Sequence, residues 1–203
     1  MISLYTRAFF FIVGHGRGWA FSSSDLLKKF SRHQSDNILS NLTKNKKIRR
    51  VCRGIYDYPK YSELLQKELS PNIDQVARAF ARKSNWRIEI SGESALNLLG
   101  LSTQVEGRYI YLSDGENRSY DILGTTLEFK KSSLKNIGFK HKESSLIVQA
   151  LKSLGKEHIT DEVIGKIRKE IDPKKFNRIL KDTQSSTVWI YETIKEICKE
   201  EVA

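Results

Sequence analysis

The side chains of this sequence with the clearest chemical capacity lie between residues 31 and 53, and they are of the kinds that contact nucleic acid. Guanidinium, amide, imidazole and ammonium groups hydrogen-bond base edges and phosphates. Ile38, Leu39 and Leu42 recur at the three-to-four spacing of a buried helix face. The opposite face of the same predicted helix carries the polar set: Arg32, His33, Gln34, Asn37, Ser40, Asn41 and Lys44. Base contacts are predicted for four of these: Arg32, Gln34, Asn37 and Asn41.

A pair of short strands follows this helix. The sequence predicts strands over 48–51 and 55–58 around a turn at Gly54, and Pro59 ends the pairing. A β-hairpin directly after a recognition helix is a wing, whose cations can follow phosphates or enter the minor groove. Phosphate contacts are predicted for the cations of this region: Lys44, Lys46, Lys47, Arg49, Arg50 and Arg53.

Earlier elements have to support the predicted recognition helix. Residues 2–13 are apolar enough for a mostly buried helix, which a run of glycines then ends. Ser22 with Asp25, and Ser31 with Gln34, have the spacing of helix starts, at which a hydroxyl accepts a backbone N–H. Two short helices joined by a tight turn, the second polar and basic on its outer face, form a helix-turn-helix.

The segment 1–69 is therefore predicted to be a winged helix-turn-helix DNA-binding domain that ends in a linker helix over 61–69. Its charge agrees, because residues 1–60 hold twelve Lys and Arg against three Asp, a net charge of +9 out of +11 for the whole chain. A localised basic field concentrates a polyanion at one face, and each neutralised phosphate releases a counterion. Helix-turn-helix units also dock proteins, so the DNA-binding prediction depends on the agreement of charge, polar face and wing.

Residues 70–203 are predicted to form a second domain, which begins at the helix-breaking run Ser70-Pro71-Asn72. The expected elements are helices over 73–83 and 94–99, strands over 86–90, 108–112, 118–123 and 126–130 with a hairpin turn at 114–117, and helices over 144–154, 161–171, 174–182 and 187–200. The predicted fold class is therefore α+β: an N-terminal winged helix-turn-helix followed by a small α+β domain with a C-terminal helical extension.

Composition argues against several classes of protein. The two cysteines, Cys52 and Cys198, lie far apart and have no zinc-binding spacing, so no disulfide framework is expected. The apolar run Ala8–Val13 is far shorter than the about 20 residues of a transmembrane helix, and no cleavage site follows it. We expect a cytoplasmic protein with reduced thiols, with no membrane partner and with no metal or cofactor.

Two alternatives to a non-enzymatic DNA-binding protein stay open. A metal-dependent nuclease could use Asp121 and Glu128 to hold Mg²⁺ and Lys130 to orient a water molecule. This pattern arises easily by chance, and no histidine or second set of acids accompanies it, so no catalytic residue is predicted. The other alternative is a plain transcriptional regulator with a small-molecule sensor domain, and the identity of the adjacent gene would test it.

Two segments carry a resemblance to a known family. The first is the wing, Ile48–Tyr56 with Pro59. The second is a longer run, which comprises Val76-Ala77, Ile90–Ala95, Leu98–Leu101 and Arg108–Ser113. Together they resemble the AbiEi antitoxins of bacterial abortive-infection and toxin–antitoxin systems, and the run Ser-Gly-Glu-Ser-Ala-Leu at 91–96 is their more specific part. The resemblance covers about residues 1–155 and does not extend over the last helices.

The resemblance implies an antitoxin that also represses its own operon. The winged helix would bind inverted repeats of double-stranded DNA in its own promoter, and two copies would pair on that DNA. The second domain would neutralise a cognate nucleotidyltransferase-like toxin, by direct or indirect means. A second basic patch could meet DNA, the toxin or the toxin's RNA target, or could be a solvated loop; it consists of Lys130, Lys131, Lys135, Lys140 and Lys142.

Overall fold

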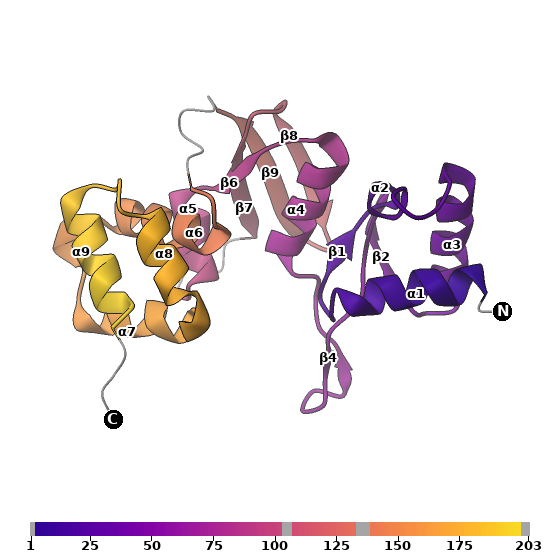
Figure 1. Cartoon of the computed structure of the whole chain (residues 1–203), viewed down its shortest axis with the longest axis horizontal. Coiled ribbons are helices and arrows are strands. Elements are labelled where there is room, and N and C mark those ends of the chain that lie inside the picture. Colours follow the sequence, from indigo (N-terminus) through magenta and orange to yellow (C-terminus); the bar gives the residue numbers. More distant parts are fainter. Residues whose placement is uncertain (1–2, 103–106, 133–138, 200–203) are drawn as a thin grey trace. The chain divides into compact units, whose positions relative to one another are not determined.

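The computed structural model describes residues 3–102, 107–132 and 139–199 (Figure 1). Two compact units divide the chain, the first comprising residues 1–87 with 119–127 and the second residues 88–118 with 128–203. Helices and small sheets together give the mixed α+β fold class that the sequence predicts. Within the described ranges, no helix combines the length and the apolar character needed to cross a membrane.

The first unit begins with three helices, and the second and third start at the predicted capping residues. At the second helix, the backbone N–H of Ser22 donates to Asp25 Oδ2 at 2.9 Å. At the third, Ser31 Oγ accepts from the Gln34 N–H at 3.3 Å, while the Ser31 N–H donates to Gln34 Oε1 at 2.9 Å. These bonds satisfy N–H groups that a helix start leaves unpaired. The three helices are α1 (Leu4–Gly14), α2 (Ser23–Leu26) and α3 (Arg32–Lys44).

A three-stranded antiparallel sheet gives the first unit its wing. The strand order is β1-β3-β2, with Arg50 opposite Tyr56. The turn between β2 and β3 contains Gly54 at φ +79°, a left-handed conformation that other residues adopt only with strain. The predicted hairpin at this position is therefore confirmed. The strands are β1 (Ala20–Phe21), β2 (Arg49–Cys52) and β3 (Ile55–Asp57).

The core of the first unit joins its helices to this sheet. Ile12 of α1, Phe21 of β1 and Ile38 of α3 are fully buried, and burial of such apolar surface is the main stabilising term in folding. An aromatic column continues from this core to the surface. The ring of Trp19 stacks between Phe21, at 4.7 Å between centroids, and His15, at 3.8 Å.

Helix α1 is less buried than the sequence predicts. Its buried side is narrow and consists of Ala8 and Ile12. Tyr5, Phe10 and Val13 are 40%, 62% and 38% exposed. The helix is apolar around more of its circumference than one packed face requires, so part of its apolar surface faces solvent.

Residues 61–69 form a two-stranded hairpin and not the predicted linker helix. Strands β4 (Tyr61–Ser62) and β5 (Lys67–Glu68) pair antiparallel. Nine residues are too few for a stable helix without tertiary packing, and Leu64 is 92% exposed. Figure 1 shows this hairpin projecting from the body of the first unit.

Helix α4 (Ile73–Ser84) begins at the predicted position, where Asn72 Oδ1 accepts from the Gln75 N–H at 2.9 Å. The helix belongs to the first compact unit. In that unit the ring of Phe80 stacks on Tyr120, with 4.0 Å between centroids. The predicted domain division between residues 69 and 70 stays a prediction.

A four-stranded sheet has the strand order β6-β7-β9-β8, and the boundary between the compact units passes through β8 and β9. The predicted hairpin turn at 114–117 is wrong, because this segment connects strands that are not neighbours. Leu127 and Phe129 make β9 more apolar than β8, so β9 takes a central place and the polar β8 an edge. The strands are β6 (Ile88–Ile90), β7 (Arg108–Ser113), β8 (Arg118–Ile122) and β9 (Thr125–Lys131).

The run Ser-Gly-Glu-Ser-Ala-Leu at 91–96 starts helix α5 (Gly92–Leu98), and its small residues have packing roles. Ser94 is buried, and its Oγ accepts from the Ile110 N–H at 2.7 Å. A Cβ atom at Gly92 would lie 2.6 Å from the Cβ of Ser153, so glycine permits the close approach of α5 to the following helix.

The C-terminal helices are confirmed at the predicted positions, and their starts follow local capping. Thr160 Oγ1 accepts from the Val163 N–H at 3.3 Å, and Asp172 Oδ1 accepts from the Lys174 N–H at 3.0 Å. The elements are α6 (Lys142–Leu154), η2 (Lys156–His158), α7 (Asp161–Glu170), η3 (Pro173–Lys175), α8 (Phe176–Asp182) and α9 (Val188–Ile197).

Candidate nucleic-acid interface

The buried side of α3 fixes which side of the helix faces solvent. Ile38 is fully buried, and Leu39 and Leu42 are almost so, within the same core as Phe21 and Leu26. This anchoring sets the rotation of α3 about its axis. The predicted polar set accordingly lies on the outer side: Arg32, His33, Gln34, Asn37, Ser40 and Lys44 are exposed, and Asn41 is partly exposed.

Three side chains follow one line along the outer side of α3. His33, Asn37 and Lys44 are separated by four and seven residues, which places them on the same helix face. The Asn37 side-chain nitrogen lies 3.0 Å from His33 Nε2, and Asn41 Oδ1 accepts from the Asn45 side chain at 3.0 Å. These contacts run along the helix surface and leave the amides at the solvent boundary, where an amide can bond an adenine edge.

Gln34 has a structural task that the sequence also predicts. Its Oε1 accepts from the Ser31 N–H at 2.9 Å at the start of α3. An amide engaged in a capping box has lost one acceptor position for a base. Base contact by Gln34 stays a prediction, whereas Arg32, Asn37 and Asn41 make no such cap.

The wing presents two predicted cations to solvent. Arg50 lies on β2 and Arg53 in the turn before Gly54, and both are exposed. Lys83, on α4, comes close to the same turn, since its Nζ lies 2.8 Å from where a Cβ of Gly54 would be. The wing tip therefore joins cations from two elements, a combination that favours phosphate contact.

Lys83 is a candidate residue that sequence reasoning missed. It lies 30 residues after Arg53 in the chain, so no local pattern links them. Its neighbour Arg82 binds Asp25 Oδ1 at 2.7 Å and the Ala20 carbonyl oxygen at 2.7 Å, which ties the end of α4 to α2 and β1. In the sequence, the adjacent basic residues Arg82 and Lys83 could have suggested a further nucleic-acid contact. Their position beside the wing, however, depends on tertiary packing.

Arg49 lies inside the wing and is not freely available at its surface. Its Nη2 binds Asp57 Oδ2 at 2.6 Å, its Nε binds Asp57 Oδ1 at 3.0 Å, and its Nη1 donates to the Leu69 carbonyl oxygen at 3.0 Å. Burial raises the pKa of Asp57, although the bond from Arg49 opposes this change. Phosphate contact by Arg49 stays a prediction, but its present bonds brace the wing against the end of β5.

Three lysines lie between α3 and the wing. Lys44, Lys46 and Lys47 are exposed, and Lys46 has a left-handed backbone at φ +52°. The Nζ of Lys47 lies 6.0 Å from the centre of the Phe9 ring, at the outer limit of a cation–π contact. These ammonium groups extend the basic surface from the end of α3 toward β2.

The residues of the nuclease alternative have other contacts. Arg108 Nη2 binds Glu128 Oε2 at 2.6 Å, and Asp121 Oδ1 accepts from the Gly124 N–H at 3.3 Å. Lys130 is exposed. Among the residues that the structure describes, no group of three His, Cys, Asp or Glu side chains could hold a metal ion. Both carboxylates of this alternative therefore have contacts within the protein, and the alternative stays a prediction.

The second basic patch is only partly within the described ranges. Lys130 and Lys131 are exposed at the end of β9, and Lys140 and Lys142 are exposed at the start of α6. Lys135 lies outside the described residues. The backbone N–H groups of Lys140 and His141 donate to Asp182, which fixes the start of α6. Burial tends to raise the pKa of Asp182, but these hydrogen bonds outweigh it and the pKa is lowered.

Both thiols are in protected surroundings. Burial raises the pKa of the Cys198 thiol to about 11, and Cys198 is 8% exposed. Burial also raises the pKa of Cys52, with nearby Lys83 and Arg50 acting in the opposite direction. A raised pKa disfavours the thiolate, so neither cysteine has the properties of a reactive nucleophile.

Comparisons with known proteins give a family match and a similar solved structure. The sequence profile described as "Family of unknown function (DUF6088)" matches residues 11–202. A search of curated proteins gave no match. The fold is similar to the crystal structure of the Rv2827c protein from Mycobacterium tuberculosis, with a TM-score of 0.42 and 11% sequence identity over 98% of this chain and 77% of that chain.

Proposed function

We propose that this chain, which belongs to the DUF6088 family, is a sequence-specific DNA-binding protein that represses its own promoter and acts as the antitoxin of a toxin–antitoxin pair. The outer side of α3 would enter the major groove, where Arg32, Asn37 and Asn41 would contact bases. The wing would follow the phosphates through Arg50 and Arg53.

The observation that carries the DNA-binding part is the agreement of two surfaces built by different elements. The outer side of α3 is polar and exposed, and the wing tip holds exposed cations from β2 and from its turn, with Lys83 of α4 beside them. A helix of this kind followed by a basic wing supports base contact and phosphate contact together.

The antitoxin part of the proposal depends on the resemblance of residues 1–155 to AbiEi proteins. The second unit would act on a nucleotidyltransferase-like toxin encoded nearby, directly or indirectly. Its exposed lysines at the end of β9 and the start of α6 are candidates for this role. These lysines belong to the second unit, so a separate task for them is compatible with DNA binding by the first unit.

Equilibrium binding to the DNA upstream of the chain's own gene tests the first part. We expect tighter binding to this DNA than to a scrambled duplex of equal length. Arg53→Ala should weaken binding to both duplexes and reduce the slope of log K against log salt by about one unit. Lys169→Ala, which removes an exposed charge from α7 in the second unit, is the matched control and should change neither quantity.

Asn37→Ala tests base contact separately from phosphate contact. The variant should lose about 1–3 kcal/mol of binding to the upstream DNA, relax specificity at one position and keep the salt slope. If it loses affinity equally for the upstream and scrambled duplexes, α3 is not the helix that distinguishes bases.

Co-expression with the neighbouring gene tests the antitoxin part. Rescue of growth by the full-length chain supports it, and rescue by the Arg50→Ala/Arg53→Ala variant would separate neutralisation from repression. If no neighbouring gene product is toxic, or if the chain does not relieve its toxicity, the antitoxin assignment is wrong while the DNA-binding assignment stands on its own measurement.

A further inference from the structure

We propose that residues 60–69, which we call the arm, dock on helix α1 of a second copy of this chain and make the protein a dimer in solution. The contact would be exchanged, with each copy giving its arm and receiving the arm of the other. It needs no DNA, so it can be tested apart from the function proposed above. The same symmetry would also present two recognition helices to an inverted repeat.

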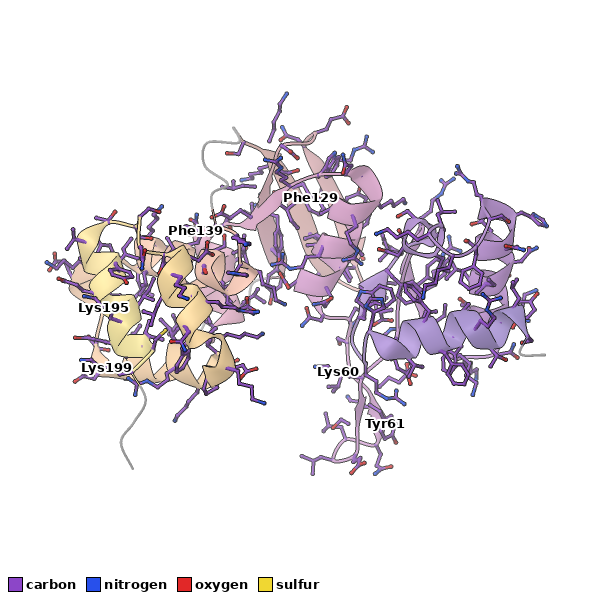
Figure 2. All side chains as sticks on the ribbon, viewed as in Figure 1. Lys60, Tyr61, Phe129, Phe139, Lys195 and Lys199 are labelled. Carbon is purple, nitrogen blue, oxygen red and sulfur yellow. The ribbon has the colours of Figure 1, made fainter. Side chains whose placement is uncertain are left out.

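The arm exposes several large apolar side chains to solvent. Leu64 is 92% exposed, Leu65 55%, Tyr61 48% and Leu69 37%. Figure 2 shows Lys60 and Tyr61 at the beginning of the arm, with the remaining arm side chains beyond them. Single exposed leucines are common on protein surfaces, but four large apolar side chains in one projecting hairpin indicate a contact surface.

The arm is nonetheless held in a defined conformation. Tyr61 Oη donates to Gln66 Oε1 at 3.1 Å, and the Gln66 side-chain nitrogen donates to the Glu63 carbonyl oxygen at 2.6 Å. At the base, Arg49 Nη1 donates to the Leu69 carbonyl oxygen at 3.0 Å. An isolated two-stranded hairpin is marginal in water, so these bonds matter. Because the arm is preorganised, docking would lose little conformational entropy.

Helix α1 offers the complementary surface. Tyr5, Phe10 and Val13 are exposed, and Phe10 is 62% exposed. The single charged residue in the range of α1 is Arg7, three positions before Phe10 and therefore beside it on the helix surface. In the arm, Glu63 directly precedes Leu64. An arm that places Leu64 against Phe10 can bring Glu63 to Arg7 of the other copy.

Charge favours a protein occupant over a nucleic acid. The arm holds two lysines, Lys60 and Lys67, and two glutamates, Glu63 and Glu68, so its net charge is zero. A surface that binds a polyanion carries an excess of cations, as the wing does. An exchanged contact would cover the exposed apolar side chains of the arm and of α1 in both copies, which gathers them into one apolar interface with a charged pair at its edge.

The first experiment measures the mass of the full-length protein in solution by sedimentation equilibrium. We expect a dimer at micromolar concentration. Leu64→Ser/Leu65→Ser should raise the dimer dissociation constant by at least about 100-fold, because two leucines lose their buried positions in each of two contacts. Val188→Ser is the matched control: Val188 is 73% exposed on α9, and its loss should leave the dimer intact.

The second experiment uses charge exchange, which does not depend on the stability of the arm. Arg7→Glu alone and Glu63→Arg alone should each be monomeric, because like charges meet in both contacts. A mixture of the two variants should form a heterodimer, since the arm of each then meets the opposite charge on α1 of the other. The double variant Arg7→Glu/Glu63→Arg should dimerise with itself.

The results separate this proposal from the DNA-binding function. A monomeric wild-type protein, an intact dimer in Leu64→Ser/Leu65→Ser, or a mixture of the charge variants that stays monomeric would each overturn the arm contact. None of these results would alter the expected effects of Arg53→Ala and Asn37→Ala on DNA. Conversely, a dimer that follows the predicted pattern but ignores the upstream DNA would support the arm and contradict the proposed function.

Discussion

The two hairpins of the first unit, the wing and the arm, are stabilised by different interactions. The wing, β2–β3, has one buried face, with Val51 and Ile55 in the core and the exposed Arg50 and Arg53 outside. The arm, β4–β5, has no buried side chain between residues 60 and 69. The wing is therefore specified by alternation of apolar and polar residues, whereas the arm is specified by local hydrogen bonds around Gln66.

The two hairpins also differ in the chemistry of their exposed surfaces. The wing gathers exposed cations, and the arm is neutral and carries exposed leucines. Arg49 connects them, since it binds Asp57 within the wing and the Leu69 carbonyl oxygen at the end of β5. Through these bonds the side chain of Arg49 joins the basic wing to the base of the apolar arm.

Loss of Asp57 should have the largest effect on stability. Asp57 is 1% exposed, and Asp57→Ala removes the close carboxylate partner of the partly buried Arg49 guanidinium, which keeps a longer contact of 3.9 Å with Glu68. We expect the free energy of unfolding to fall by about 2–4 kcal/mol, measured by urea denaturation. Glu116→Ala removes a similar pair with Arg118 that is exposed, and should cost no more than about 0.5 kcal/mol. Equal losses in the two variants would contradict the bracing role of Arg49.

Gly54→Ala tests the wing turn. The φ of +79° at Gly54 is costly for alanine, so we expect a loss of about 1–2 kcal/mol in the free energy of unfolding. The new Cβ would also meet the Nζ of Lys83, which can move aside because it ends a flexible side chain. Gly14→Ala is the control, since Gly14 ends α1 with nothing within 4 Å of its added Cβ. In thermal and urea unfolding, Gly54→Ala should lower the stability of the protein and Gly14→Ala should not.

Lys83→Ala and Lys67→Ala compare one lysine near the wing with one in the arm. Lys83→Ala should weaken DNA binding about 5-fold, the scale of one modest charge contact, and reduce the salt slope by about one unit. Lys67→Ala, on β5, should leave both quantities unchanged if the arm does not touch DNA. Binding isotherms at several salt concentrations measure both effects. If both variants reduce the salt slope, the arm contacts the phosphate backbone, and this result would count against its proposed docking on α1.

Much of the first unit could be predicted because its information is local. Ser31 with Gln34 sets the start of α3, the spacing of Ile38 and Leu42 sets its buried side, and Gly54 sets the wing turn. These are interactions within a few residues or regular periods along one element.

The parts that sequence reasoning missed depend on contacts between distant segments. Residues 61–69 were predicted to be a linker helix, but the segment is a hairpin whose Leu64 and Leu65 are exposed. No apolar face of the segment packs against the core, so its conformation could not be predicted from a buried face. Lys83 reaches the wing only through the packing of α4. The central place of β9 follows from competition between strands for burial, which a linear pattern does not express.

His15 should give the smallest effect, and its sign is fixed by its surroundings. Burial against the stacked ring of Trp19 lowers the pKa of His15 below its ordinary 6.5, and nearby Arg82 lowers it further. The unfolded chain therefore binds the proton more readily than the native state. The contribution of His15 to stability is fully present above about pH 6.5, and it is lost as the pH falls through the lowered pKa of the native state. His15→Phe keeps a ring against Trp19 without a titrating group. The difference in melting temperature between wild type and His15→Phe should change across this pH window. A difference that stays constant with pH would show that protonation of His15 does not affect the stability of the protein.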